Sequence, residues 1–561
     1  MHHAQSVDFY SFSCSSVGCA VEILTRAFIG HRRLKGGGGV VIEEKGLTWG
    51  QKYFWDSYLK LALEDQWTKN SMMDIPVPED TSVERVLACL KVLTRRHEGL
   101  RTHYGVDGTG SPVQKVRSEF TIPLKVEVVG SREEAVAFSG RLCREGFRIT
   151  EEPPVRAGVV VDSRLPDRAR RLFLVLHHIV ADWFAQGIVR SEVEWLLGGG
   201  PEGALALPVQ PRDLMEYESS QVGLRKRDRS TEYWRSLIPT FPRTAFPVPA
   251  VVVEPGTAME AVFASSEMTR SCRRVSRTQG VSVPACLLAC YALALSAYVG
   301  NDHVGIAVSS ANRHRRAGLS ALANMMQSLP VRLDVRGTHN FSDLLHRARE
   351  CETQVLRYGL FDPDHAADAT RDVLERRGLD LDAIPGFNCL SHGGGRPSQG
   401  SAPFEEHTIT RLGGRLRHVL QMRCRSDAGI LRTSLRYNAE VLPGEDVEAF
   451  LRGMARILTV YERSPEVGLE ELIDLAGLPV LSRGPGWFRS EGCWVSTAQT
   501  EEMIQRIPEI TKASVREEGG LVQALVSTSE PVPEERFRRL LHAQVRNHPA
   551  SVVPDRFSFC E

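Results

Sequence analysis

The sequence lacks most of the features that place a protein in a special class at first sight. Its basic and acidic residues each number 69, so the formal net charge is zero and a broad basic surface for nucleic acid or a polybasic membrane tether is not indicated. No apolar run reaches the ~18–20 residues of a transmembrane helix, and the first thirty residues have no basic segment followed by an apolar core. We therefore expect no nucleic acid, no membrane span, no secretory signal and a cytoplasmic location.

Cysteine is present, but not in the spacing of a zinc site or a disulfide framework. The twelve cysteines are scattered, no Cys-x-x-Cys pair occurs, and Cys286 and Cys290 lie four apart on a predicted helix. This pattern predicts reduced, mostly buried thiols and no metal centre.

Several common catalytic and nucleotide-binding motifs are also missing. The chain has no Gly-x-Gly-x-x-Gly after a predicted strand, no Walker loop, no His-Glu-x-x-His and no Gly-x-Ser-x-Gly. Nucleotide binding, zinc-dependent proteolysis and serine hydrolysis therefore lack their minimal signals.

What remains is an ordinary globular composition with both helices and strands. Hydrophobic residues make up 42% and charged residues 25%, and at ~100–200 residues per domain the 561 residues predict three to four structural units. Apolar periodicity indicates a fold of the α+β or mixed α/β class. We predict helices over residues 50–62, 82–97, 281–298 and 444–461, strands over 171–176, 304–308 and 431–437, and loops over 198–201 and 391–403.

The most informative stretch places two histidines directly after a predicted buried strand. His177 and His178 are followed by Asp182, four residues after the second histidine. Side chains alternate along a strand, so only one of the two imidazoles can face a given cavity, where it could accept and return a proton near neutral pH. Asp182 could fix the loop through an ion pair with an arginine. A buried, structurally satisfied histidine pair is the alternative for this motif taken alone.

Five further blocks in the same order turn this motif into a family resemblance. Residues 95–102 resemble the "RHExLRT" block of nonribosomal peptide synthetase condensation domains, and residues 177–182 resemble their "HHxxxDG" active-site motif. The resemblance covers roughly residues 40–480. Its other blocks are Leu47–Gln51, Asp213–Tyr217 with Tyr233-Trp234, Asn312-Arg313 with Ser328–Arg332, and Phe387-Asn388.

The resemblance implies a fold and a reaction. The fold would be a pseudo-dimer of two chloramphenicol-acetyltransferase-like lobes in a V, here residues 40–225 and 226–480, with a tunnel between them. A thioester on one carrier protein would meet an amine acceptor and form an amide. No cofactor would be bound covalently, because peptidyl or aryl carrier proteins, or other synthetase modules, would supply phosphopantetheine thioesters.

The resemblance also assigns residues. His178 would be the catalytic histidine, His177 its structural support, and Asp182 the anchor of the loop, paired with Arg313 or Arg332. Arg101 would make a further structural ion pair. Trp183, Gln327 and Ser328 would line the substrate tunnel.

Two blocks depart from the family pattern. Trp183 stands where the family has the glycine that closes the histidine motif. In the block that holds Asn312-Arg313 and Ser328–Arg332, Ala323 and Gln327 stand at the usual glycine and asparagine positions. A tryptophan brings a large ring into or beside the tunnel, where it would narrow the acceptor side, change substrate choice or mark lost catalysis.

These departures leave alternatives open. Three alternatives are compatible with the same fold. They are a non-catalytic protein that holds carrier proteins, an ester-forming variant with a hydroxyl acceptor, and a transferase that uses coenzyme A thioesters. Both histidines are retained, which speaks against a heterocyclising relative, and the chain shows no Asp-Ser-Leu-type phosphopantetheine attachment site for a cis carrier, which ranks epimerisation low.

The two ends of the chain carry separate expectations. Residues 1–39 look like a lightly structured extension, and residues 485–561 resemble the C-terminal subdomain of adenylation enzymes, as a strand–helix–strand–helix–strand unit. No lysine follows Lys512, so this tail lacks the catalytic lysine of that subdomain and is expected either to pack as a remnant or to dock a partner. We expect a free-standing enzyme, because its length leaves no room for an adenylation core or a carrier.

Overall fold

The computed structural model describes residues 39–243, 246, 258–313, 316–390, 404–412, 419–427, 429–490, 493–530, 532–545, 548 and 550–560. The chain divides into two compact units. The first runs to Asp228 and adds Ala311–Gln327 and Leu360–Pro363, and the second holds Arg229–Ser310, Ser328–Gly359 and the rest from Asp364. The expected lobe boundaries at 225 and 480 remain predictions. The expected N-terminal extension and the loop at 391–403 lie outside the described residues, except for Gly39.

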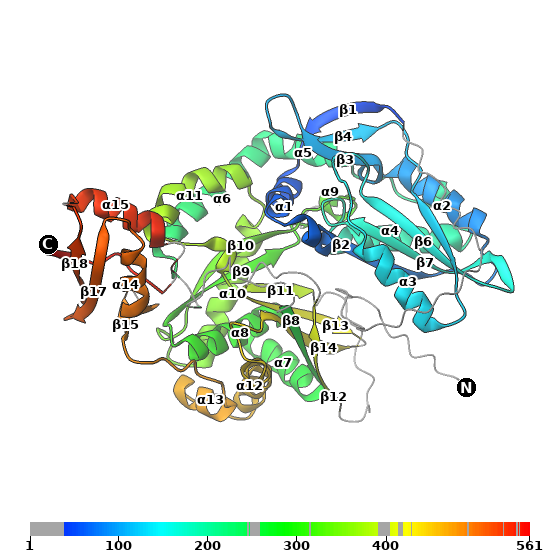
Figure 1. Ribbon diagram of the computed structural model, residues 1–561. Helices are drawn as coiled ribbons and strands as arrows, with labels where there is room; N and C mark the ends of the chain where they lie inside the picture. The colour runs from blue at the N-terminus through cyan, green and yellow to red at the C-terminus, as the bar shows by residue number, and fades with distance from the viewer. Residues whose placement is uncertain are drawn as a thin grey trace, which may run out of the picture. The chain divides into compact units, whose positions relative to one another are not determined.

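The first unit is built on two sheets. A four-stranded sheet has the order β2-β7-β6-β5, and a three-stranded antiparallel sheet has the order β1-β4-β3 (Figure 1). The predicted strand over 171–176 is confirmed as the buried end of β7. The strands are β1 (Val41–Gly46), β2 (Asn70–Pro76), β3 (Thr102–Val106), β4 (Pro112–Arg117), β5 (Leu124–Val128), β6 (Val155–Asp162) and β7 (Leu165–His177).

Amphipathic helices pack on these sheets. The helices predicted over 50–62 and 82–97 are confirmed with slightly different ends. Ser82 caps α2 by accepting the Arg85 N–H at 3.1 Å, which satisfies a donor that the first turn leaves free. The helices that lie wholly in this unit are α1 (Trp49–Leu59), α2 (Val83–Arg96), α3 (Arg132–Arg144), α4 (Trp183–Leu197), α5 (Pro211–Ser219) and the short α9 (Arg316–Leu319), and α6 (Gln221–Leu237) leads into the second unit.

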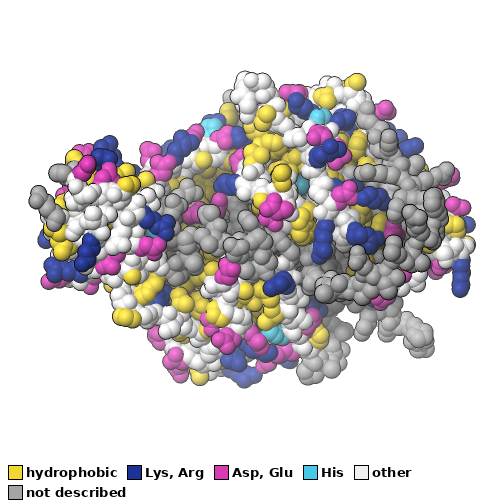
Figure 2. Space-filling view, viewed as in Figure 1, with side chains coloured by type: hydrophobic (Ala, Val, Ile, Leu, Met, Phe, Trp, Pro, Cys, Tyr) yellow, Lys and Arg dark blue, Asp and Glu magenta, His cyan; other side chains and the backbone are white. Residues whose placement is uncertain are grey.

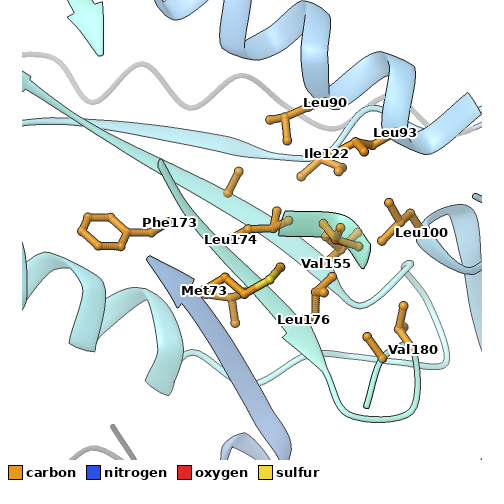
Figure 3. Close-up of a cluster of buried hydrophobic side chains, with 14 of the residues drawn as sticks. Met73, Leu90, Leu93, Leu100, Ile122, Val155, Phe173, Leu174, Leu176 and Val180 are labelled. Carbon is orange, nitrogen blue, oxygen red and sulfur yellow. The ribbon is translucent and has the colours of Figure 1, made fainter. Parts of the chain in front are cut away.

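The core of the first unit gathers around β7. Leu174 and Leu176 of β7 face Leu90 and Leu93 of α2 and the neighbouring Met73 of β2 (Figure 3). All five side chains are almost fully buried. Because β7 is buried along the run that precedes the histidines, the hydrophobic core fixes where this strand ends.

The second unit is built on a mixed seven-stranded sheet with the order β10-β9-β11-β13-β14-β8-β12. The predicted strands over 304–308 and 431–437 are confirmed as β9 and β14. The strands are β8 (Ala258–Ser265), β9 (His303–Ser310), β10 (Gln327–Asp334), β11 (Gly386–Leu390), β12 (Glu405–Arg411), β13 (Leu420–Asp427) and β14 (Ile430–Asn438).

The predicted helices over 281–298 and 444–461 are confirmed as α8 and α12. Every residue of α8 from Ala285 to Val299 is buried, which explains its continuous apolar sequence. The helices of this unit before its C-terminal part are α7 (Ser266–Gln279), α8 (Val283–Val299), α10 (Phe341–Tyr358), α11 (Pro363–Arg377), α12 (Gly444–Arg463) and α13 (Leu469–Ala476).

Among the described residues, none of the individual helices has the length and apolar character needed to cross a membrane. The bent pair formed by α7 and α8 meets that test only when the two helices are joined.

The C-terminal part of the second unit forms a small subdomain with its own core. Phe537 and Leu541 of α15 pack against Val526 of β18 and Met503 of α14. The structure has two more strands than the sequence pattern predicts, because a hairpin precedes the first helix and two antiparallel strands follow it. The elements are β15 (Trp487–Ser490), β16 (Cys493–Ser496), α14 (Thr497–Gln505), β17 (Ile510–Glu518), β18 (Leu521–Thr528), α15 (Glu534–Val545) and β19 (Arg556–Cys560).

The surface and the thiols agree with the composition. Basic and acidic side chains are interspersed over the visible face (Figure 2), as the balanced charge predicts. All ten described cysteines are free and eight of them are buried, which confirms the expected buried thiols for this part of the chain. Cys14 and Cys19 lie outside the described residues.

Candidate active site

The two histidines lie at the end of β7, held by neighbouring backbone on both sides. The His177 N–H donates to the Pro154 carbonyl at 3.0 Å, and the His178 N–H donates to the Lys69 carbonyl at 2.8 Å. The His177 side chain is 1% exposed, whereas that of His178 is half-buried. The alternation of a strand therefore sends the two imidazoles into different surroundings, as predicted.

His177 is enclosed by aromatic rings. Its ring lies edge-on to Tyr58 at 5.1 Å, to Phe54 at 5.9 Å and to Phe147 at 6.4 Å between centroids. Its Nδ1 accepts the Ile179 N–H at 3.3 Å, so the proton of the neutral ring belongs on Nε2. Burial, and then the charges of His178 and Lys69, hold the pKa of His177 well below its ordinary value. The His177 ring is therefore held in its neutral form.

His178 stacks on the ring of Phe54, which α1 supplies. The two ring centroids are 4.7 Å apart and the planes are 17° from parallel. The Lys69 Nζ lies 5.2 Å from the centroid of the same phenyl ring and 3.4 Å from the Ser57 hydroxyl. Stacking and the backbone bond to Lys69 together restrict the orientation of the imidazole.

Asp182 caps the helix that follows the histidines and binds a buried arginine. Its Oδ1 accepts the Ala185 N–H at 2.9 Å, which makes Asp182 the N-cap of α4. The Arg313 guanidinium donates to both carboxylate oxygens at 2.9 Å, and the Met325 N–H donates to Oδ2 at 3.0 Å. Of the two arginines considered from the sequence, Arg313 is therefore the partner of Asp182.

Arg313 also organises the segment from Ala311 to Gln327. Its guanidinium donates to the carbonyls of Ala321 at 3.0 Å and Ala323 at 2.8 Å. Asn312, at φ 55°, is the only non-glycine residue with positive φ among the described residues, and its amide donates to the Met325 carbonyl at 2.9 Å. The segment is thus folded around one arginine and tied to α4 through Asp182.

Gln327 lies at the end of this segment and is fully buried. Its amide donates to the Phe361 carbonyl at 2.8 Å, while its Oε1 accepts from the Phe361 N–H and the Asn312 amide, each at 3.2 Å. A side chain whose polar atoms are all engaged inside the fold does not line a tunnel. The expected substrate contact of Gln327 is therefore replaced by a structural role.

Comparison with known protein families assigns the chain to a family. A family model described as "Condensation domain" matches residues 51–364, which is more than half of the chain. The match includes both histidines, Asp182 and Arg313. The chain belongs to the condensation-domain family.

Curated relatives of this condensation domain are large synthetases. It is 27% identical over 302 residues to phosphinothricin tripeptide synthetase PhsC of Streptomyces viridochromogenes, covering 51% of this chain and 27% of that protein. It is 24% identical over 401 residues to tyrocidine synthase 3 of Brevibacillus parabrevis, covering 69% of this chain and 6% of that protein. The chain thus spans well under half the length of these relatives.

Solved structures support the fold. The condensation domain of the monacolin K polyketide synthase MokA matches with a TM-score of 0.59 at 20% identity, covering 76% of this chain and 99% of that one. The SgcC5 protein of Streptomyces globisporus matches with a TM-score of 0.61 at 18% identity, covering 76% of this chain and 100% of that one. At these identities the likeness concerns the fold alone.

The first block of the condensation domain brings α1 against the Arg313 segment. Thr48 and Gln51 form a reciprocal capping box at the start of α1. A Cβ on Gly50 would lie 2.4 Å from the Asn324 carbonyl oxygen, and the Asn324 amide donates to the Gly50 carbonyl at 3.1 Å. A glycine is required at position 50, because the two backbones touch there.

The arginine-rich block of the condensation domain is structural. Arg96 binds the Glu192 carboxylate of α4 through two contacts of 3.1 Å, and His97 Nε2 lies 2.9 Å from the same group. Burial raises the pKa of Glu192, but bonds from His97 and Arg96 more than offset it and lower the value to about 2. Arg101 lies 3.7 Å from Glu98, which fits its expected ion-pair role.

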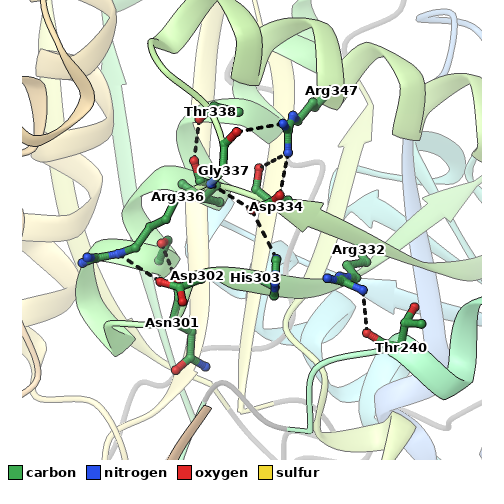
Figure 4. Close-up of polar contacts among 12 residues, drawn as sticks. Thr240, Asn301, Asp302, His303, Arg332, Asp334, Arg336, Gly337, Thr338 and Arg347 are labelled. Carbon is green, nitrogen blue, oxygen red and sulfur yellow. Dashed lines mark hydrogen bonds and ion pairs between the residues drawn. The ribbon is translucent and has the colours of Figure 1, made fainter. Parts of the chain in front are cut away.

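The other candidate residues, Trp183, Ser328 and Arg332, take no part in the Asp182–Arg313 pair. Trp183 is the first residue of α4 and is 40% exposed. In the second unit, Ser328 is half-buried with its hydroxyl 3.2 Å from that of Ser309. Arg332 donates to the Thr240 carbonyl at 3.0 Å (Figure 4), so it serves a different contact from the Asp182 pair.

Sequence reasoning missed three residues that shape the site. Phe54 and Lys69 surround the histidines, and Glu218 of α5 accepts the Trp49 N–H at the start of α1 with both oxygens, at 3.0 and 3.1 Å. The available signal was that Phe54 and Glu218 lie beside a predicted block; Lys69 lies in none. Their contacts join segments far apart in the chain, which no local pattern encodes.

Proposed function

We propose that this condensation domain forms amide bonds in peptide biosynthesis. An acyl or aminoacyl group would pass from a phosphopantetheine thioester on a carrier protein to an amine acceptor. The carriers would be peptidyl or aryl carrier proteins, or other synthetase modules, on separate chains. The observation that carries the proposal is the half-buried His178 at the end of β7, four residues before Asp182, which pairs with the buried Arg313.

His178 is the residue proposed to move the proton. The amine nitrogen attacks the thioester carbon, the C–S bond breaks, and one proton passes from nitrogen to the departing sulfur. An α-amine has a pKa of ~8, so part of it is already neutral at pH 7 and a strong base is not required. An imidazole that takes this proton and returns it to sulfur serves both steps.

Asp182 is proposed as a positioning residue. Its carboxylate accepts from two backbone N–H groups and from the Arg313 guanidinium. These bonds engage both oxygens inside the fold, and the place of Asp182 at the start of α4 orders the loop between His178 and the helix.

Reconstitution with two loaded carriers tests the proposal. We expect His178→Ala to lower turnover ~10²–10⁴-fold, measured by intact mass of the acceptor carrier, with an unchanged Tm. His339→Ala, an exposed histidine of the second unit, is the matched control and should leave turnover unchanged. Full activity of His178→Ala would exclude His178 as the proton carrier.

A non-catalytic scaffold for carriers is the second candidate, and Trp183 is the observation that favours it. A half-exposed indole at the start of α4 replaces the glycine of the family motif. The same reconstitution separates the two: carrier binding without any product in the unmutated protein supports the scaffold.

A further inference from the structure

Lys69 is joined to His178 through the backbone. It is the last residue of the short 3-10 helix Leu63–Lys69, which leads directly into β2. The register of β2 with β7 pairs Asn70 with His177, and the pairing continues one residue further, because the His178 N–H donates to the Lys69 carbonyl at 2.8 Å. Lys69 and His178 are therefore neighbours across the two strands, although they lie far apart in the chain.

The side chain of Lys69 reaches the same phenyl ring as the imidazole of His178. The Lys69 Nζ lies 5.2 Å from the centroid of the Phe54 ring, within the distance at which a cation is attracted to the face of an aromatic ring. The His178 ring lies 4.7 Å from the same centroid and is 17° from parallel. One phenyl ring thus interacts with both the ammonium and the imidazole.

The ammonium is itself held by α1. The Lys69 Nζ donates to the Ser57 hydroxyl at 3.4 Å, and Ser57 follows Phe54 by three residues, which places both side chains on one face of the helix. Phe54 and Ser57 are buried, and Lys69 is half-buried. Because a cation–π contact is stronger where water is excluded, this place favours the contact between the ammonium and the ring.

The backbone that carries Lys69 is anchored on both sides. Before it, the Tyr58 hydroxyl of α1 donates to the Gln66 amide oxygen at 2.5 Å. After it, the Asn70 amide donates to the Cys143 carbonyl at 2.8 Å. Lys69 therefore links the position of α1 to the end of β7.

A lysine at this place has a cost that an apolar residue would avoid. Only ten of the 69 basic residues in the chain are lysines. Partial burial of an ammonium among aromatic rings loses hydration, whereas an apolar side chain of similar length would fill the same space without that loss. The charge also reaches the histidine pair: burial, and then the charges of His178 and Lys69, lower the pKa of His177. The ammonium is thus better explained by its contacts with Phe54 and Ser57 than by packing alone.

We propose that Lys69 is a positioning residue for His178. Its ammonium holds the Phe54 ring, and the ring holds the imidazole stacked on it, so that His178 presents its nitrogen to the reacting amine in one direction. The inference rests on the proposed function, since it concerns the proton transfer assigned to His178. A misplacement of about 1 Å can cost ~10²-fold in rate, which sets the scale of the expected effect.

Reconstitution with loaded carriers measures the kinetic effect. Lys69→Met keeps the length of the side chain and the backbone bond to His178, and removes the charge. We expect it to lower kcat about 10–100-fold and to leave KM nearly unchanged. Lys69→Arg, whose guanidinium also lies well against an aromatic ring, should recover most of the loss. Lys91→Met, at an exposed lysine of α2, is the matched control and should leave kcat unchanged.

A second readout needs no turnover. The ring current of Phe54 shifts the Hε1 resonance of the stacked imidazole, which is observed in protein with isotope-labelled histidine and assigned by its loss in His178→Gln. We expect this resonance to move in Lys69→Met towards its position in Phe54→Leu, and to stay near the wild-type position in Lys69→Arg. Thermal unfolding shows whether Lys69→Met is folded. If it is not, Ser57→Ala replaces it, and the resonance should move in the same direction.

A resonance that stays in place in the folded variant would overturn the proposal, whatever the kcat. A wild-type kcat in Lys69→Met would overturn it too, and so would a raised KM at unchanged kcat, which would indicate a substrate contact. Lys69→Arg with the same loss as Lys69→Met would also contradict it. If the wild type forms no product but the resonance moves as expected, the proposed function fails and the positioning of the His178 ring by Lys69 stands.

Discussion

At the scale of single residues, Asp182 shows how one side chain serves several structural tasks. It caps α4 through the Ala185 N–H, fixes the Met325 N–H and pairs with Arg313, all in a buried place. Burial strengthens each of these contacts. It also means that removing one partner lowers the stability of the fold, because the other charge is then buried without a counter-charge. The loop after His178 is therefore ordered by a buried ion pair.

Breaking this pair from one side should destabilise the fold. We expect Arg313→Met to lower the free energy of unfolding by about 3–5 kcal/mol, because Asp182 is left buried without its counter-charge. Urea unfolding followed by circular dichroism measures the change. The double variant Asp182→Leu, Arg313→Met should recover part of the loss, and a double variant no better than the single one would contradict this account.

Trp183 is a second residue whose effect is testable alone. Because its ring is half-exposed at the first helical position, Trp183→Gly should change stability by no more than about 1 kcal/mol. We expect kcat/KM for a bulky amine acceptor to rise about tenfold relative to a small one. The control is Trp195→Ala, at a half-exposed tryptophan later on the same helix, which should not change the ratio of kcat/KM between bulky and small acceptors. If Trp183→Gly also leaves this ratio unchanged, the indole does not restrict the acceptor.

At the scale of elements, α1 is positioned by contacts from distant segments. Its start is capped by Thr48 and held by Glu218, its Gly50 touches Asn324, and its Phe54 stacks on His178. A helix that supplies a ring to the candidate site is thus oriented by α5 and by the Arg313 segment. Changes at its N-terminus should reach the histidines through Phe54.

The Glu218 contact predicts a dependence on pH. Burial raises the pKa of Glu218 to about 8, the Trp49 N–H lowers it and Asp362 raises it further. A folded pKa above the unfolded one means that the folded state binds the extra proton. This contribution to stability is complete below about pH 4.5 and is lost as the pH rises through 8.

Glu218→Gln keeps an acceptor for the Trp49 N–H and removes the titration. We expect the wild type to lose on the order of 2–4 kcal/mol more stability than Glu218→Gln between pH 5 and 9, measured by urea unfolding at several pH values. Glu216→Gln, an exposed carboxylate on the same helix, is the control. Parallel pH profiles for wild type and Glu218→Gln would contradict the assignment.

At the scale of the whole molecule, the C-terminal subdomain is a fixed part of the second unit. Trp494 donates its indole N–H to the Gly300 carbonyl at 3.2 Å, and the Arg483 guanidinium lies 4.8 Å from the Trp494 ring centroid. Arg489 pairs with Asp302 at 2.8 Å, beside the polar cluster of β9 and β10 in Figure 4. The subdomain is therefore attached by specific contacts at the end of α8.

Loosening this attachment should be visible without loss of the fold. We expect Trp494→Ala to increase hydrogen exchange at the Leu481 N–H, which bonds to the Tyr298 carbonyl at 2.8 Å, about tenfold or more. The loss of one hydrogen bond and two cation–π contacts, from Arg483 and Arg489, accounts for a change of that size. Arg516→Ala, on an exposed strand of the same subdomain, should leave the exchange unchanged.

The amino-acid sequence by itself determined the fold class, the strongly apolar or amphipathic helices and strands, the histidine pair and the family. Periodic burial and short motifs are local properties, so β7, α2, α8 and the motif after β7 could be predicted from neighbouring residues. Tertiary structure alone decided that Asp182 pairs with Arg313, that Gln327 binds Phe361 inside the fold, and that Lys69 and His178 share the Phe54 ring. Each of these depends on contacts or strand register between segments distant in the chain, which burial of the common core fixes and no local spacing encodes.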